Sequence, residues 1–267
     1  MFPSCRPDPP LFSITNLSSN QIFCFGHAGM GEAFQYPANT YESIEPCLRI
    51  GADGTEIDVQ LSADSALVLY HDHDLSTKTD ATGKIADHDW AAMEDTRYAS
   101  PISTDVYLRR LDDILDRFAD GHRIFTLDCK LLPAAGEDYG QYRLRFAHAI
   151  VRLAQDRRMA NQLFVESDDA DFLTLLHQSE PTLRLFIYRQ DFGAALATAD
   201  AQDLYGITIN ARYITSAQVD SAHAHSRRVT LFGAVTEDEN IAAIAKSPDH
   251  IQSDKIIHLL KVFGKYR

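Results

Sequence analysis

The chain has 267 residues, of which 45% are hydrophobic and 24% are charged, as in an ordinary globular protein. Its formal net charge is −13, which argues against a nucleic-acid partner and against electrostatic docking on anionic lipid, because both of those surfaces are themselves negative. The length allows one large α/β domain or two small ones, and a small-molecule partner fits this charge best.

The four cysteines are Cys5, Cys24, Cys47 and Cys129, and none belongs to a CxxC pair, so neither a zinc site nor a redox dithiol is expected. Cys24 and Cys129 lie in strand-like runs and are expected to be buried. No apolar run approaches the length of a transmembrane helix. The sequence as written has no signal peptide, which predicts a cytoplasmic protein. However, Ser4-Cys5 before a proline-rich run resembles the processed end of a bacterial lipoprotein, so a start upstream of Cys5 would predict a periplasmic, lipid-anchored protein.

In chain order, residues 1–20 are expected to form an irregular, proline-rich leader. Residues 22–26 predict a buried strand, and a loop through residue 40 leads to a helix that Ser43 caps, with Pro46 in its first turn and Gly51 after its end. Strands at 54–61 and 67–70 follow, and their link is too short for a parallel crossover. We therefore expect an antiparallel hairpin or a local distortion of the sheet there. A polar loop at 75–87 and a short helix near 90–95 come next.

From residue 111 onward, helical and strand-like segments alternate regularly. Helices are expected at 111–118, 142–158, after 168, and at 192–201, 216–226, 238–245 and 255–263. Strands are expected at 123–131, 163–166, 184–188, 206–210, 229–235 and 251–253. This alternation is typical of parallel strands joined by crossover helices. The number of units predicts a single-domain TIM (β/α)₈ barrel over residues 21–267, with an open doubly wound sheet as the alternative.

Charged side chains follow a pattern on these strands. Glu56 and Asp58 share one face of the strand at 54–61, because side chains alternate along a strand. Asp128 and Lys130 repeat that spacing on the strand at 123–131, and the next strand ends in Glu166. Since active groups of a barrel gather at the C-terminal ends of its strands, we expect these side chains to meet. Structural pairing of Lys130 with Glu56 or Asp58 is the plain alternative. However, Glu56, Asp58 and Asp128 outnumber Lys130 by two, which favours a hard divalent cation.

Two histidines end strands that should lie near these acids. His27 follows the first strand and His71 follows the strand at 67–70. Imidazoles beside a carboxylate-bound cation suit general acid and general base catalysis near neutral pH. We expect His27 to act as the base and His71 as the acid, with Lys130 as a fixed positive charge for an anionic group.

Several short motifs occur in register over residues 22–95. They are HAG at 27–29, PANT at 37–40, GADGTEIDVQLS at 51–62 and HDHDLSTKTDATGKI at 71–85. Together with LDCK at 127–130 and, more loosely, IQSD at 251–254, they resemble the glycerophosphodiester phosphodiesterase family. The resemblance implies a TIM barrel that hydrolyses glycerophosphodiesters to glycerol 3-phosphate and an alcohol, with one Ca²⁺ or Mg²⁺ ion.

The resemblance also implies roles for single residues. By position, His27 and His71 would form the acid–base pair, Glu56, Asp58 and Asp128 would hold the metal, and Lys130 would bind phosphate. We expect Asn39 either to contact the phosphate or to cap the turn into the following helix. Glu166 is expected to line the substrate site.

Three positions depart from the family pattern. Ala28 stands where the family usually has an arginine that would contact phosphate, Ala38 replaces an acid, and Asp128 replaces a glutamate and is one methylene shorter. Aspartate followed two residues later by lysine is also similar to sphingomyelinase D enzymes, which form cyclic phosphates. A lyase of that type, and a non-catalytic barrel that binds phosphate headgroups or sugars, are therefore the alternatives to a hydrolase.

Overall fold

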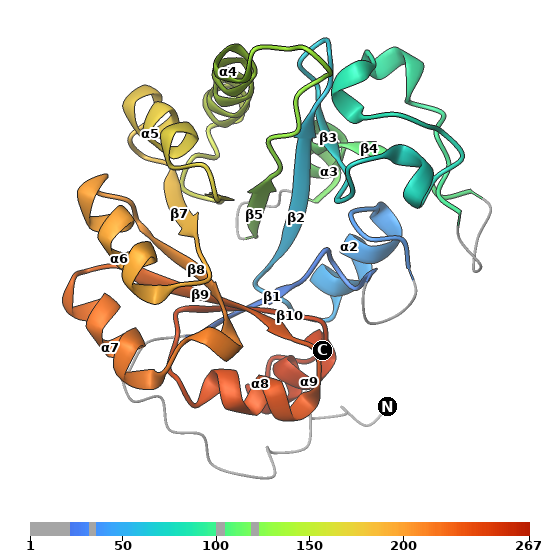
Figure 1. Cartoon of the computed structure of the whole chain (residues 1–267). Coiled ribbons are helices and arrows are strands. Elements are labelled where there is room, and N and C mark those ends of the chain that lie inside the picture. Colours follow the sequence, from blue (N-terminus) through green and yellow to red (C-terminus); the bar gives the residue numbers. More distant parts are fainter. Residues whose placement is uncertain (1–21, 32–35, 100–104, 119–122) are drawn as a thin grey trace, which may run out of the picture.

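The structure is a computed structural model that describes residues 22–31, 36–99, 105–118 and 123–267 (Figure 1). The expected leader at 1–20, including Cys5, lies outside the described residues. Cys24, Cys47 and Cys129 are buried, as expected for the two that lie in strands. In the described part of the chain, no helix combines the length and the hydrophobicity that a membrane span requires.

Eight parallel strands form a closed barrel. They are β1 (Phe23–Gly26), β2 (Gly54–Leu61), β5 (Ile124–Cys129), β6 (Leu163–Ser167), β7 (Arg184–Tyr188), β8 (Gly206–Asn210), β9 (Arg228–Ala234) and β10 (His250–Ser253). Each strand pairs with the next along the chain, and β1 pairs with both β10 and β2. Because the first strand, β1, pairs with the last strand, β10, the parallel sheet closes on itself and has no free edge. The predicted TIM barrel is thus confirmed, and the open doubly wound sheet is excluded.

Helices cover the outside of this barrel (Figure 1). Those in the described residues are α2 (Tyr41–Arg49), α3 (Leu111–Phe118), α4 (Tyr139–Arg157), α5 (Ala170–Ser179), α6 (Phe192–Ala201), α7 (Ser216–Ala224), α8 (Glu237–Ile244) and α9 (Ile256–Val262). They pack their apolar faces on the outward side chains of the strands, such as Ile57, Val59 and Leu61 of β2. Glu56 and Asp58, which alternate with these residues, consequently face the barrel interior.

The helix after the first loop begins earlier than its sequence indicated. Thr40 is the N-cap of α2, and Ser43 is its third residue, where the Ser43 hydroxyl accepts a hydrogen bond from the Thr40 backbone N–H. Pro46 therefore lies in the second turn rather than the first. The expected Ser43 cap was wrong. Thr40 and Ser43 both carry hydroxyl groups that can cap a helix, and the local pattern does not decide which of the two is the N-cap.

The segment between β2 and α3 is an insertion with its own small core. β3 (Leu67–Leu69) runs antiparallel to β2, as the short link predicted, and β4 (Arg109–Arg110) pairs with β3. The expected loop at 75–87 contains two short 3₁₀ turns, and a third covers Trp90–Ala92. A second hydrophobic cluster holds this insertion together, comprising Val68, Tyr70, Leu75, Ile85, Met93, Tyr98, Val106 and Leu108. The insertion, coloured cyan to green in Figure 1, carries His71, which lies two residues after the end of β3.

Candidate active site

A pocket of about 270 Å³ opens at the C-terminal ends of the barrel strands. Its lining contains both predicted histidines and all five predicted strand-borne charged residues, together with four residues from the later strands. The complete set is His27, Glu56, Asp58, His71, Asp128, Lys130, Glu166, Tyr188, Thr208, Phe232 and Gln252. The expectation that the charged side chains gather at one rim of the barrel is therefore met. Asn39 is not among the lining residues.

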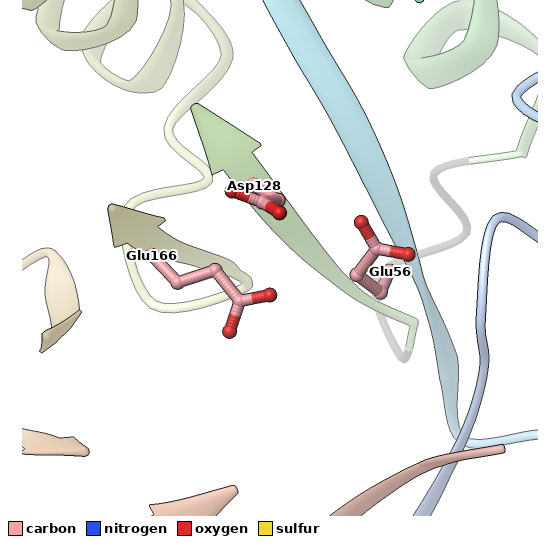
Figure 2. Close-up of side chains that lie close together, drawn as sticks. All are labelled: Glu56, Asp128 and Glu166. Carbon is pink, nitrogen blue, oxygen red and sulfur yellow. The ribbon is translucent and has the colours of Figure 1, made fainter. Parts of the chain in front are cut away.

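Three of these carboxylates form a tight cluster. One oxygen atom from each of Glu56, Asp128 and Glu166 lies within 4.8 Å of the other two. Figure 2 shows the three side chains converging from β2, β5 and β6. The strands are neighbours in register, with Asp128 paired to Glu166. The sequence predicted Glu166 as a substrate-binding residue. In the structure it lies beside two of the predicted metal ligands, Glu56 and Asp128.

Glu56 is fixed by the loop that follows β1. The backbone N–H of Ala28 donates a hydrogen bond of 2.8 Å to Glu56 Oε2, and the N–H of Gly29 donates to Thr55 Oγ1 at 3.0 Å. Gly29 has φ +74°, and a Cβ there would stand 2.6 Å from the Ser43 carbonyl carbon, so glycine is required for this close approach. Burial, followed by the charge of Asp58, raises the pKa of Glu56 well above its usual value.

Asp58 lies beside the cluster and has partners of its own. Its Oδ2 accepts a hydrogen bond of 2.8 Å from Asn39 Nδ2, and its backbone N–H donates to Asn39 Oδ1 at 2.9 Å. Lys130 Nζ lies 3.2 Å from Asp58 Oδ1. Burial alone would raise the pKa of Asp58, but Lys130, His71 and Asn39 hold it below its usual value. Asn39 thus anchors Asp58 through both its amide nitrogen and its amide oxygen, and the N-cap of α2 is the next residue, Thr40.

Lys130 is shared between two carboxylates. Its Nζ is 2.5 Å from Asp128 Oδ2 in addition to the contact with Asp58. Burial would lower the pKa of Lys130, but Asp128 and Asp58 raise it, so the ammonium stays charged. The plain alternative, pairing of Lys130 with Glu56 or Asp58, is therefore realised for Asp58, and Lys130 pairs with Asp128 as well. Within the described residues, Lys130 forms no ion pair with Glu56.

Glu166 is held by neutral donors. Its Oε2 accepts a hydrogen bond of 2.6 Å from Thr208 Oγ1, and its Oε1 accepts one of 2.9 Å from Gln252 Nε2. These donors come from β8, two strands away from β6, and from β10, on the opposite side of the barrel. Burial and the charge of Asp128 raise the pKa of Glu166 to about 7. The two hydrogen bonds and the charge of Lys130 lower this pKa, but they do not outweigh burial and Asp128.

Both histidines lie at the rim with one ring nitrogen hydrogen-bonded to an aspartate. His27 Nδ1 is 2.6 Å from Asp254 Oδ1, and His71 Nδ1 is 2.7 Å from Asp72 Oδ1. His27 Nε2 lies 3.9 Å from Glu56 Oε2. Burial would lower the pKa of His27, but the hydrogen bond to Asp254 and the charges of Glu56 and Asp254 raise it to about 10. The side chain of His71 is 55% exposed, compared with 33% for His27.

The balance of charge at the rim favours a bound cation. Glu56, Asp58, Asp128 and Glu166 bring four carboxyl groups to one pocket, whose positive groups are the ammonium of Lys130 and the protonated ring of His27. Carboxylate oxygens are the ligands that Ca²⁺ and Mg²⁺ prefer, and burying like charges together is costly unless a cation offsets them. The donor set therefore fits a hard divalent cation.

Several functional candidates were not identified from the sequence. Asp254 belongs to the IQSD motif, which was noted, but nothing local indicated that it would reach His27. Thr208 and Gln252 are ordinary strand residues until the barrel closes around Glu166. Tyr188 and Phe232 form one wall of the pocket, with ring centroids 5.5 Å apart in an edge-to-face arrangement. Tyr188 and Phe232 lie in segments that were predicted as strands, but nothing in the local sequence indicated that they would line the pocket.

The model of the glycerophosphoryl diester phosphodiesterase family matches residues 27–258. A glycerophosphodiester phosphodiesterase from Bacillus altitudinis is 37% identical over 70 residues, which are 26% of this chain and 28% of that protein. One from Bacillus subtilis (strain 168) is 23% identical over 180 residues, or 62% of this chain and 59% of that protein. The chain thus aligns with less than two thirds of the length of either relative.

Solved structures resemble the whole barrel. A glycerophosphoryl diester phosphodiesterase from Silicibacter pomeroyi DSS-3 superposes with a TM-score of 0.80 at 18% identity, covering 94% of this chain and 97% of that one. A phosphodiesterase from Oleispira antarctica, solved in complex with the product sn-glycerol-3-phosphate, has a TM-score of 0.79 at 20% identity and covers 92% and 98%. At these identities the likeness establishes the fold.

Proposed function

The chain belongs to the glycerophosphoryl diester phosphodiesterase family, and we propose that it hydrolyses glycerophosphodiesters to glycerol 3-phosphate and an alcohol with the help of one divalent cation. The observation that carries this proposal is the rim pocket, which is lined by clustered carboxylates and by two histidines that are each hydrogen-bonded to an aspartate. The Oleispira antarctica neighbour, with sn-glycerol-3-phosphate bound, supports the choice of product.

The residues proposed to hold the cation are Glu56, Asp58 and Asp128, as the family resemblance implies, with Glu166 as a fourth carboxylate. The shorter side chain of Asp128 is compatible with this role, because its carboxylate already lies in the cluster with Glu56 and Glu166. Ca²⁺ accepts six to eight oxygen ligands and Mg²⁺ six, so four carboxylates leave room for the substrate. When bound, such a cation stabilises negative charge on a phosphate oxygen.

His27 and His71 are proposed as the acid–base pair. One removes a proton from the attacking water, and the other gives a proton to the oxygen of the leaving alcohol. The raised pKa of His27 favours the proton-donor role for it in the cation-free protein, which is the reverse of the order expected from the sequence. A bound cation would offset the same carboxylates that raise this pKa, so we propose the pair and leave its order to experiment.

Lys130 is proposed to help bind the phosphate. A cation that draws Asp128 into its shell would weaken the contact between Asp128 and Lys130, and the ammonium would then be available to an anionic substrate. The arginine that the family usually carries is Ala28 here, so Lys130 and the protonated histidine are the positive groups of the protein that remain in the pocket lining.

The test is release of glycerol 3-phosphate from glycerophosphocholine by the purified chain, measured by a coupled dehydrogenase assay with Ca²⁺, with Mg²⁺ and with EDTA. We expect release that EDTA abolishes and that excess divalent cation restores. Glu56→Gln serves as the matched loss-of-site variant, because the amide keeps the size of the side chain but not its charge.

The other outcomes identify the alternatives. Phosphorus NMR that detects a cyclic phosphate as the final product would replace hydrolysis with a lyase reaction of the sphingomyelinase D type. Absence of any product across a range of glycerophosphodiesters, from a folded protein that still binds divalent cations, would support a non-catalytic binding barrel instead.

A further inference from the structure

We propose that Asp254 is a positioning residue that holds His27 in its working orientation, an inference that rests on the proposed function for its chemistry. Asp254 Oδ1 is 2.6 Å from His27 Nδ1, and the two residues are 227 positions apart in the chain. None of the motifs discussed above assigns a role to this carboxylate.

The position of Asp254 follows from closure of the barrel. β10 ends at Ser253, which is paired in parallel register with Gly26 at the end of β1. The next residue of each strand therefore lies on the same rim, and the backbone N–H of His27 reaches the Ser253 carbonyl at 3.4 Å. The backbone N–H of Asp254 donates to the Ala234 carbonyl at 3.2 Å, so β9 anchors the residue from its other side.

This contact determines which ring nitrogen faces the pocket. A carboxylate that accepts the Nδ1–H of a histidine fixes the plane of the ring and leaves Nε2 for proton transfer or substrate contact. His27 Nε2 lies on the side of the carboxylate cluster, 3.9 Å from Glu56 Oε2. Without Asp254 the ring could turn about its χ2 angle and exchange the two nitrogens.

His71 has the same kind of partner by a different route. Asp72, the next residue in the chain, lies 2.7 Å from His71 Nδ1. That pair needs only the local backbone, whereas the His27–Asp254 pair needs β1 and β10 to meet. Orientation of His27 is thus coupled to the closure of the barrel, and orientation of His71 is not.

The kinetic test uses Asp254→Ala in the full-length chain, with Asp254→Asn as a second variant of nearly equal size. We expect kcat for glycerophosphocholine to fall by about 10²-fold, as is typical when the partner of a functional histidine is lost, with KM changed less than about threefold. Asp200→Ala is the matched control, because Asp200 Oδ2 accepts from His225 Nδ1 at the same 2.6 Å but lies outside the pocket. The control should keep its wild-type kcat.

A double-mutant cycle separates positioning from a general structural role. If Asp254 acts through His27, adding Asp254→Ala to His27→Ala should lower kcat no further. Losses that multiply in the double variant, or a wild-type kcat in both Asp254 variants, would overturn the proposal.

An NMR measurement keeps the inference testable without activity. We expect a strongly downfield, slowly exchanging imidazole N–H proton in the wild type that disappears in both His27→Gln and Asp254→Ala and persists in Asp200→Ala. If the wild type shows this proton but hydrolyses no glycerophosphodiester, the proposed function fails while the His27–Asp254 pair stands. If no such proton depends on Asp254, the pair itself is rejected.

Discussion

Replacement of Lys130 by methionine tests whether the charge at the rim is balanced as described. Lys130 Nζ contacts Asp128 Oδ2 at 2.5 Å and Asp58 Oδ1 at 3.2 Å, and methionine keeps most of the aliphatic length without the charge. The variant therefore leaves two carboxylates beside Glu56 and Glu166 with no ammonium between them. In the absence of a divalent cation, the folded state should lose stability.

The size of the loss follows from the burial of the pair. Removing one partner of a buried ion pair costs about 3–5 kcal/mol, because the remaining charge stays desolvated. The side chain of Lys130 is 26% exposed and that of Asp128 is 30% exposed, so solvent screens part of the effect, and we take the lower end of that range. A loss of about 3 kcal/mol corresponds to a decrease in Tm of about 6–12 °C for a chain of this length.

The assay is urea unfolding in EDTA and again in saturating Ca²⁺. A cation present at 100 times its Kd stabilises a folded protein that binds it by about 2.7 kcal/mol, so Ca²⁺ should restore most of the stability lost in Lys130→Met. Lys265→Met is the matched control, since Lys265 Nζ is 2.6 Å from Asp53 Oδ2 with similar exposure but at the opposite end of β2. It should lose stability in EDTA and gain from Ca²⁺ only as much stability as the wild type does, whereas Lys130→Met should gain more.

Two results would refute this reasoning. One is a loss below about 1 kcal/mol for Lys130→Met in EDTA, which would mean that solvent already screens the rim carboxylates. The other is a gain of stability from Ca²⁺ that is abolished in Lys130→Met but kept in Lys265→Met, which would mean that the ammonium is needed for the cation site to form.

Three further changes are predicted. Glu166→Gln should weaken Ca²⁺ or Mg²⁺ binding by at least about tenfold in isothermal titration calorimetry. Even residues that only hydrogen-bond to metal ligands contribute about 10–100-fold to affinity, and this variant loses a charged ligand. An unchanged Kd would show that Glu166 is not a ligand. His71→Ala should lower turnover by about 10²- to 10⁴-fold while cation binding is retained, and near-normal hydrolysis would reject the acid–base scheme. Burial lowers the pKa of His250 to about 4 from 6.5, so the unfolded state binds more protons between these values and stability should fall by about 2–3 kcal/mol as the pH drops from 6.5 to 4. His250→Phe should show a smaller loss over that range in urea unfolding, and equal slopes for both proteins would contradict the assignment.

The local pattern of the sequence determined the elements and the faces of the strands. Alternation along β2 puts Glu56 and Asp58 on the face opposite Ile57 and Val59, because successive side chains of any strand point to opposite sides. Regular alternation of strands with helices determined a parallel sheet in the same way, since parallel strands need crossover connections, and the number of units favoured the barrel over an open sheet. The short link before β3 likewise excluded a parallel crossover, and the structure has the antiparallel pair that was one of the two expected outcomes.

Only the tertiary structure decided which side chains meet across the barrel. Glu166 lies in one cluster with Glu56 and Asp128, and Lys130 forms ion pairs with both Asp58 and Asp128. Asp254 forms a hydrogen bond with His27. These contacts depend on the relative register of neighbouring strands and on the pairing of β1 with β10. Register is set by packing between residues far apart in the chain, and shifting it by one residue would turn every inward side chain outward. The sequence therefore named His27, His71 and the charged residues on the strands at the rim, whereas closure of the sheet decided which partners they contact.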